Sequence, residues 1–128
     1  MRESTSVLNS LAEAYARLNT KRFLVECFLL SLCSEIIDVL SSLTCTHFSP
    51  ACSESNSIFA DQNGMFLWEP AVALKFWWVI AFEVVYSALI YRLSKQWVLA
   101  ALPFIYGFVT LYRTDIDNFA VIIRGFFR

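Results

Sequence analysis

The first long apolar stretch of the chain covers residues 23–45 and reads FLVECFLLSLCSEIIDVLSSLTC. An α-helix needs about 20 mostly apolar residues to cross a bilayer, and this stretch is long enough. Comparable apolar stretches follow at residues 71–91 and 96–112, the last of which is short. The pattern predicts an all-α integral membrane protein with three transmembrane helices, arranged as a single membrane domain over residues 1–128.

The composition is typical of a membrane protein. Of the 128 residues, 58% are hydrophobic and 16% are charged, whereas an ordinary soluble domain is roughly 45–50% apolar and about 25% charged. The formal net charge is −1 and no basic cluster is present, so we expect no nucleic-acid partner. The sequence lacks a Gly-rich phosphate loop, a G-x-S-x-G motif and an H-E-x-x-H motif, so we expect no enzymatic activity.

Less apolar segments flank and connect these spans. Residues 4–18 place five apolar side chains on one helical face, which predicts an amphipathic helix lying on the membrane surface. A helix packed on a soluble partner is the alternative. Residues 46–69 form the predicted outer loop, and residues 114–128 form a tail that docks at the interface, since its apolar part is too short for a fourth span. The apolar face of the surface helix consists of Val7, Leu8, Leu11, Tyr15 and Leu18.

The distribution of basic residues predicts the orientation. Lys and Arg precede the first span and occupy the turn at residues 92–96, but none lies in the loop at residues 46–69. The positive-inside rule places the N-terminus and that turn in the cytoplasm, and three spans then place the C-terminus outside. The basic residues that carry this prediction are Arg2, Arg17, Lys21, Arg22, Arg92 and Lys95.

Polar side chains of the first span share one side of its predicted helix. At about 100° per residue, that side carries Cys27, Ser31, Ser34, Glu35, Asp38, Ser42 and Cys45. The Phe, Leu, Ile and Val residues between positions 23 and 43 favour insertion by roughly 4–7 kcal/mol. Each buried acid costs about 2.5–3.5 kcal/mol, so Glu35 and Asp38 nearly cancel that gain. We therefore expect this polar stripe to face protein or a wet cavity, or its acids to be protonated.

The second span offers a cation for these acids. Lys75 and Asp38 lie at a similar depth, roughly 8–10 Å inside the outer ends of their spans. Adjacent antiparallel helices would bring them level, so we predict a buried Asp38–Lys75 ion pair. Glu83 lies two turns deeper, and Glu35 lies between Lys75 and Glu83 in depth. Two interpretations stay open: these four residues lock the register of the helices, or they form an ion or proton site.

Cysteines lie at the end of the first span, Cys45, and in the outer loop, Cys52, and the loop also holds the only histidine of the sequence, His47. Cys45 and Cys52 are predicted to form a disulfide on an oxidising side of the membrane. Together with His47 and Glu54 they are an alternative set of metal ligands, but the spacing fits no standard zinc pattern, so we expect no metal. A single histidine also excludes a bis-histidine haem within one chain.

Aromatic side chains crowd the second and third spans. We expect them to face lipid and neighbouring helices, and we expect no cofactor, with a bound lipid, quinone or pigment as the alternative. These residues are Phe76, Trp77, Trp78, Phe82, Phe104, Tyr106, Phe108 and Tyr112.

One series of residues resembles a known pattern. It consists of Asp38-x-x-Ser41, Glu54-x-Asn56, Lys75 and Tyr112. Over residues 35–118 the chain resembles a family of short three-helix membrane proteins of bacteria and archaea to which no function is assigned. The chain departs from that pattern at Ser57, where the family has proline, and its loop is longer. The resemblance implies the three-span fold, a bacterial or archaeal cytoplasmic membrane, and a shared role for Asp38, Glu54, Asn56 and Lys75.

Three functions are consistent with these features. The leading hypothesis is an accessory or structural subunit of a larger membrane protein complex, in contact with membrane lipids and bound through its polar stripe and aromatic faces. The second is a small ion- or proton-coupled carrier or channel component that acts as a homo-oligomer. The third is a pigment-, quinone- or lipid-binding membrane module.

Overall fold

The computed structural model describes residues 2–48, 59–63 and 65–126. In this part of the chain every regular element is a helix, and the only β-structure is an isolated antiparallel bridge between Ala60 and Phe66. The prediction of an all-α fold is confirmed. The helices are α1 Arg2–Leu18, α2 Lys21–Phe48, α3 Trp68–Trp77, the π-helix η1 Trp78–Val84, α4 Val85–Ser94, α5 Trp97–Ala100 and α6 Leu102–Phe126.

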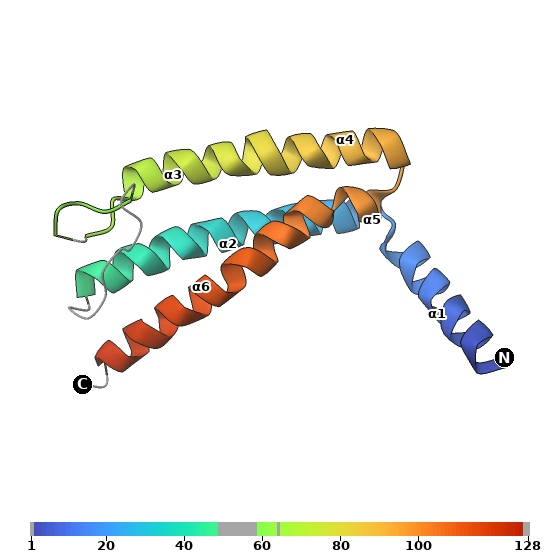
Figure 1. Cartoon of the computed structure of the whole chain (residues 1–128), viewed down its shortest axis with the longest axis horizontal. Coiled ribbons are helices and arrows are strands. Elements are labelled where there is room, and N and C mark those ends of the chain that lie inside the picture. The colour runs from blue at the N-terminus through green and yellow to red at the C-terminus, as the bar shows by residue number, and fades with distance from the viewer. Residues whose placement is uncertain (1, 49–58, 64, 127–128) are drawn as a thin grey trace.

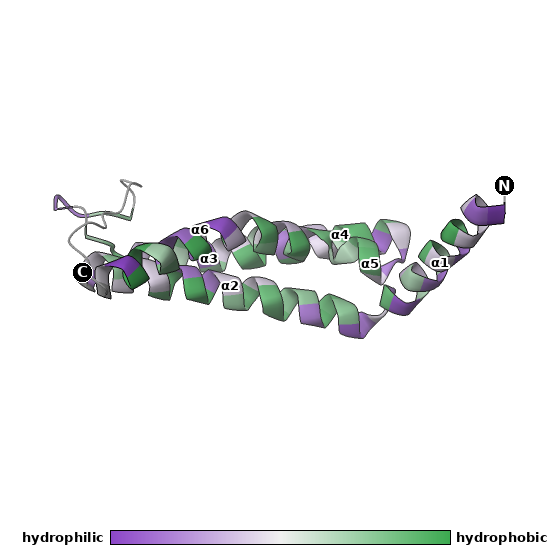
Figure 2. Ribbon diagram, turned by 90° about the horizontal axis from the view of Figure 1, so that it is seen from below, coloured by the Kyte–Doolittle hydropathy of each residue, from purple (hydrophilic) through white to green (hydrophobic). Residues whose placement is uncertain are grey.

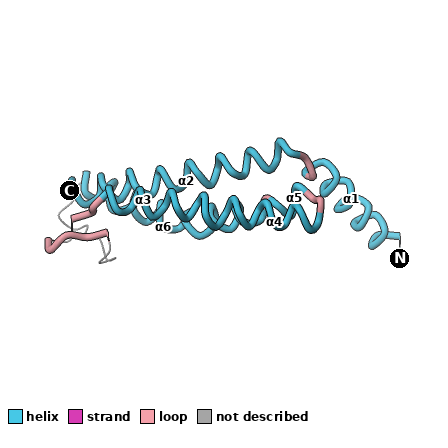
Figure 3. Tube along the Cα trace, turned by 90° about the horizontal axis from the view of Figure 1, so that it is seen from above, coloured by secondary structure: helices cyan, strands magenta, loops and turns pink. Residues whose placement is uncertain are grey.

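These helices form three long rods and one shorter arm (Figure 1). Helix α2 is the first rod, α3, η1 and α4 form the second as a continuous helix, and α5 with α6 forms the third. The rods lie side by side, and α2 packs mainly against α6 (Figures 1 and 3). Helix α1 extends away from the end of the bundle where the turn between α4 and α5 lies (Figure 1).

Two helical segments are long and apolar enough to cross a membrane. They are Trp68–Ser94 and Trp97–Gly125, and only about a fifth of each apolar window is buried within the protein (17% and 22%). Helix α2 is not among them. It carries Glu26, Glu35 and Asp38 within its apolar stretch, and these charges lower its hydropathy. The structure therefore gives two candidate spans, and the third predicted span belongs to the proposal below.

Many polar side chains are buried inside the bundle, and many large apolar side chains are exposed on its outside. Figure 2 shows that hydrophobic residues predominate along all three rods, with hydrophilic residues between them. In the described part of the chain, the buried polar or charged residues are Ser31, Ser34, Glu35, Asp38, Ser41, Thr46, Glu83, Ser87 and Asp115. Large apolar side chains on all three rods are exposed, for example Leu40 at 55%, Trp77 at 65% and Val109 at 61%. This arrangement is the reverse of a water-soluble core.

An apolar cluster closes the bundle near α1. Cys27 of α2 is buried against Ala101 and Phe104, and Phe28 meets Phe104 edge to face at 5.3 Å between ring centroids. The third rod is interrupted here, between α5 and α6, because Pro103 has no backbone N–H and its ring disfavours a continuous helix.

Helix α6 continues without interruption from Leu102 to Phe126, past the predicted boundary between the third span and the tail, so residues 114–126 belong to the same helix. The side chains of Asp115 and Asn118 explain the continuation, because both hydrogen-bond to serines of α2 and hold this part of α6 against the bundle.

Candidate functional site

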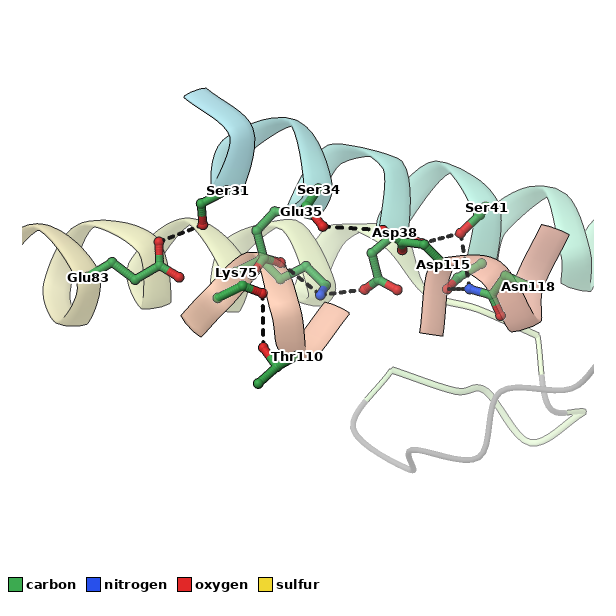
Figure 4. Close-up of polar contacts among 12 residues, drawn as sticks. Ser31, Ser34, Glu35, Asp38, Ser41, Lys75, Glu83, Thr110, Asp115 and Asn118 are labelled. Atoms are coloured by element: carbon green, nitrogen blue, oxygen red, sulfur yellow. Dashed lines mark hydrogen bonds and ion pairs between the residues drawn. The ribbon is translucent and has the colours of Figure 1, made fainter. Parts of the chain in front are cut away.

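Lys75 occupies the centre of the polar interior. Its Nζ lies 2.9 Å from Glu35 Oε2 and also forms an ion pair with Asp38 Oδ2 (Figure 4). The side chains of Lys75, Glu35 and Asp38 are 19%, 8% and 11% exposed. Lys75 therefore forms ion pairs with two carboxylates. One is Asp38, the partner that the sequence predicts, and the other is Glu35.

Glu83 lies two turns further along the second rod. Ser31 Oγ donates a hydrogen bond of 2.7 Å to Glu83 Oε2, and the residue is 3% exposed. The other oxygen, Oε1, has no hydrogen-bond partner among the described residues. It lies against α6 at Gly107, where an added Cβ would be 2.0 Å from Oε1 and 3.0 Å from Ser31 Oγ. A larger residue at position 107 would require the Glu83 carboxyl group to move.

Asp115 and Asn118 extend the polar interior toward the other end of α6. Ser34 Oγ donates a 3.2 Å hydrogen bond to Asp115 Oδ2, and Asp115 Oδ1 has no partner in the described structure. Asn118 Nδ2 donates to Ser41 Oγ at 3.0 Å and to Ser42 Oγ at 3.2 Å (Figure 4). The three rods are thus connected by polar contacts over several helical turns.

The π-helix determines which residues of the second rod face this interior. From residue 71 to residue 87, every fourth residue points inward, namely Ala71, Lys75, Val79, Glu83 and Ser87. An α-helix has about 3.6 residues per turn, so a spacing of four would rotate steadily away from the bundle. A π-helix bonds residue i to residue i+5 and has more residues per turn, and η1 therefore keeps Lys75 and Glu83 on one face.

The interior holds more acids than bases. Its described residues include four buried carboxyl groups, on Glu35, Asp38, Glu83 and Asp115, and one partly buried ammonium group, on Lys75. Charged groups taken out of water need partners or must become neutral. Such a site can hold the helices together, and it can also bind positive charge.

The other predicted site residues are placed separately. Cys45 is fully buried near the end of α2, and its predicted disulfide partner Cys52 lies outside the described residues, as do Glu54 and Asn56. His47 is exposed. No group of three or more His, Cys, Asp or Glu residues that could hold a metal ion occurs in the described ranges.

Asp115, Asn118 and Gly107 were not among the predicted site residues. Asp115 and Asn118 lie in the segment that was interpreted as a tail, so their position in a helix facing α2 was not considered. A signal was available, because residues 107, 111, 115 and 118 follow the helical spacing that continues from the third span.

Asn19 is a further missed residue, at the junction between α1 and α2. Its Oδ1 accepts hydrogen bonds from the backbone N–H of Trp97 at 2.7 Å and of Val98 at 3.3 Å. Its Nδ2 donates to Gln96 Oε1 at 2.6 Å, as does the Tyr15 hydroxyl at 2.9 Å. Asn19 thus caps α5 from a distant part of the chain and ties the α1–α2 junction to the turn after α4.

A groove opens on the outer side of the central ion pairs. It lies between α2 and α3, has a volume of about 440 Å³, and is lined mainly by apolar side chains such as Leu40, Val72 and Phe76. Glu35 and Lys75 also line it. This groove is relevant to the alternative hypothesis that the protein binds a lipid, a quinone or a pigment.

Comparison with known proteins gives no relative. No protein-family model, no curated protein and no solved structure matches the chain. The resemblance to the family of short three-helix membrane proteins stays a prediction.

Proposed function

We propose that this chain is an integral membrane protein with three spans that serves as an accessory or structural subunit of a larger membrane complex. The observation that carries the proposal is the reversed distribution of polarity, with four carboxyl groups inside and large apolar side chains outside on all three rods. In a bilayer, the exposed Leu, Val, Phe and Trp side chains meet lipid or a partner's apolar surface.

The membrane placement extends to α2. Its carboxylates Glu35 and Asp38 are directed at Lys75 and away from the outer surface. These charges make membrane insertion of an isolated α2 less favourable, and the free-energy cost falls when the three rods assemble and the charges are paired. In this topology the N-terminus and the α4–α5 turn are cytoplasmic and the C-terminus is outside, with α1 on the membrane surface.

The packing of the interior supports a structural role. The Glu83 carboxyl group fills the space above Gly107, and Asn118 bridges two serines of α2. These contacts join helices through side chains and leave the three rods held in one register. The outward faces carry exposed aromatic residues such as Phe76, Trp77 and Tyr106, a residue class enriched where proteins associate.

Purification in a mild detergent tests the proposal. The full chain should co-purify with larger membrane proteins at a fixed stoichiometry. A matched variant, Trp77→Ala, removes a large side chain that is 65% exposed, so it should weaken that association without unfolding the bundle. A chain that purifies alone as a homogeneous homo-oligomer, or as a water-soluble monomer without detergent, would contradict the proposal.

The excess of buried carboxyl groups favours a second candidate, a small ion- or proton-coupled carrier or channel component that acts as a homo-oligomer. Intramembrane ionisable residues are typical of ion and proton pathways. The purified chain in liposomes would then conduct protons or cations, and Asp38→Asn would abolish the flux. Absence of flux above that of empty liposomes would reject this candidate.

A further inference from the structure

We infer that Glu83 is a proton-binding site, and that in the folded protein its carboxyl group carries an exchangeable proton. The inference uses the membrane placement of the proposed function, and it is independent of whether the chain joins a complex. The argument depends on what surrounds the carboxyl group on each rod.

First, no cation pairs with the Glu83 carboxyl group in the described part of the chain. The Lys75 ammonium group is already shared by Glu35 and Asp38. The charged group of α2 that acts on Glu83 is Glu35, which has the same sign. On α6 the carboxyl group meets Gly107, which offers no charge. An ionised Glu83 would therefore be a third carboxylate beside a single lysine.

The second step is the incomplete hydrogen bonding. Ser31 Oγ donates to Oε2 and the Trp78 side chain also approaches the carboxyl group, while Oε1 is buried with no partner at hydrogen-bond distance in the described structure. A charged oxygen left in this state costs far more than a neutral one, because a carboxylate needs several donors to replace water. A protonated carboxyl group is neutral and its oxygens are weaker acceptors than carboxylate oxygens, so a buried oxygen without a partner costs less in that form.

The third step is the backbone around the residue. Glu83 lies in the π-helix Trp78–Val84, and π-helical turns within α-helices are frequent at functional sites. Here the π-helix directs Glu83 at Ser31 and Gly107, whereas a regular α-helix would rotate it away from the face of Lys75. The backbone irregularity therefore serves to place this carboxyl group between the other two rods.

A proton is favoured over a metal ion as the occupant. The described ranges contain no group of three or more carboxylate, Cys or His side chains that could hold a metal. Oε1 is also buried and lies against Gly107, which has no side chain to act as a ligand. A proton needs neither extra ligands nor extra volume.

Infrared spectroscopy of the full chain in lipid nanodiscs tests the inference. At neutral pH, the wild-type protein should show the carbonyl band of a protonated carboxylic acid, shifted by exchange into D₂O and lost in Glu83→Gln. A spectrum in which wild type and Glu83→Gln are identical in this region would overturn it. Loss of the band on adding Na⁺ at constant pH would also overturn it, in favour of a cation site.

Carbodiimide labelling gives a second readout. Dicyclohexylcarbodiimide adds to protonated carboxyl groups in apolar surroundings, with no leaving group, so mass spectrometry should find the adduct on Glu83. Labelling should fall as the pH is raised, and it should be absent from Glu69, which is exposed. An adduct found on Glu35 and not on Glu83 would place the proton elsewhere.

A matched pair of variants separates a proton site from a purely structural carboxylate. Gln resembles a protonated Glu in shape, so Glu83→Gln should leave the unfolding midpoint close to that of the wild type. Glu35→Gln removes a carboxylate that faces Lys75 at 2.9 Å and should lower the midpoint. Equal losses for both variants would contradict the inference. A chain that is soluble without detergent would refute the proposed membrane placement separately.

Discussion

Replacing Lys75 by Met should be the most damaging single change in the polar interior. The substitution keeps an apolar stem of similar length but removes the ammonium group that pairs with both Glu35 and Asp38. Two carboxylates that are 8% and 11% exposed would then lie close together without a cation. Removing one partner of a buried ion pair typically costs about 3–5 kcal/mol, and we expect this range for Lys75→Met.

Neutralising one acid should lower the free energy of unfolding by less than Lys75→Met does. In Asp38→Asn, Lys75 keeps Glu35 at 2.9 Å, so the loss is one charge-assisted hydrogen bond, about 1.5–3 kcal/mol. The triple variant Lys75→Met, Glu35→Gln and Asp38→Asn contains no unpaired charge at this position. It should therefore be more stable than Lys75→Met alone by about 2 kcal/mol or more.

Reversible unfolding in mixed micelles measures these differences. The free energy of unfolding is determined for the wild type, the single variants and the triple variant at neutral pH, with helix content followed by circular dichroism. The expected order of stability is wild type, Asp38→Asn, the triple variant, and last Lys75→Met. The reasoning is refuted if Lys75→Met costs no more than Asp38→Asn, or if the triple variant is as unstable as Lys75→Met.

Three further changes have expected outcomes in the same assay. Gly107→Ala places a methyl group 2.0 Å from Glu83 Oε1 and should destabilise the protein by about 1–3 kcal/mol, and the loss should largely disappear when Glu83 is also replaced by Ala. Asn19→Ala removes the cap on the Trp97 and Val98 backbone and should cost about 1 kcal/mol, while Asn19→Asp, which keeps an acceptor, should cost less. Lys95→Gly should stabilise by about 1 kcal/mol, because Lys95 has a φ of 58°, a left-handed conformation that glycine adopts without a steric penalty; no gain in the unfolding midpoint would contradict this.

Much of the helical structure could be predicted because it depends on local composition. Apolar runs of sufficient length predicted the second and third long helical segments, and Pro103 lies where the third is interrupted. The polar stripe of α2 was also visible in the sequence, because α2 is a regular helix and its 3.6-residue period can be read directly from Ser31, Glu35 and Asp38.

The end of α6 could not be predicted in the same way. Thr114 and Asp117 resemble a helix start, and the residues after them are apolar over too short a length for a span. What keeps this segment in α6 is contact with α2, through the pairs Asp115–Ser34 and Asn118–Ser41. These contacts join residues 81 and 77 positions apart, so the helical spacing of residues 107–118 alone does not identify their partners on α2.

The arrangement of the acids shows most clearly where local information ends. Depth along the helices was enough to pair Asp38 with Lys75, because the rise per residue is constant. In a regular α-helix, however, Lys75 and Glu83 would differ by roughly 80° in direction. The π-helix brings both onto one face, and it is the packing of the three rods that allows Glu83 to lie against Ser31 and Gly107. The residue types and spacing thus determined that acids occur within an apolar helix bundle, and the packing of distant helices decided which of them obtained a partner.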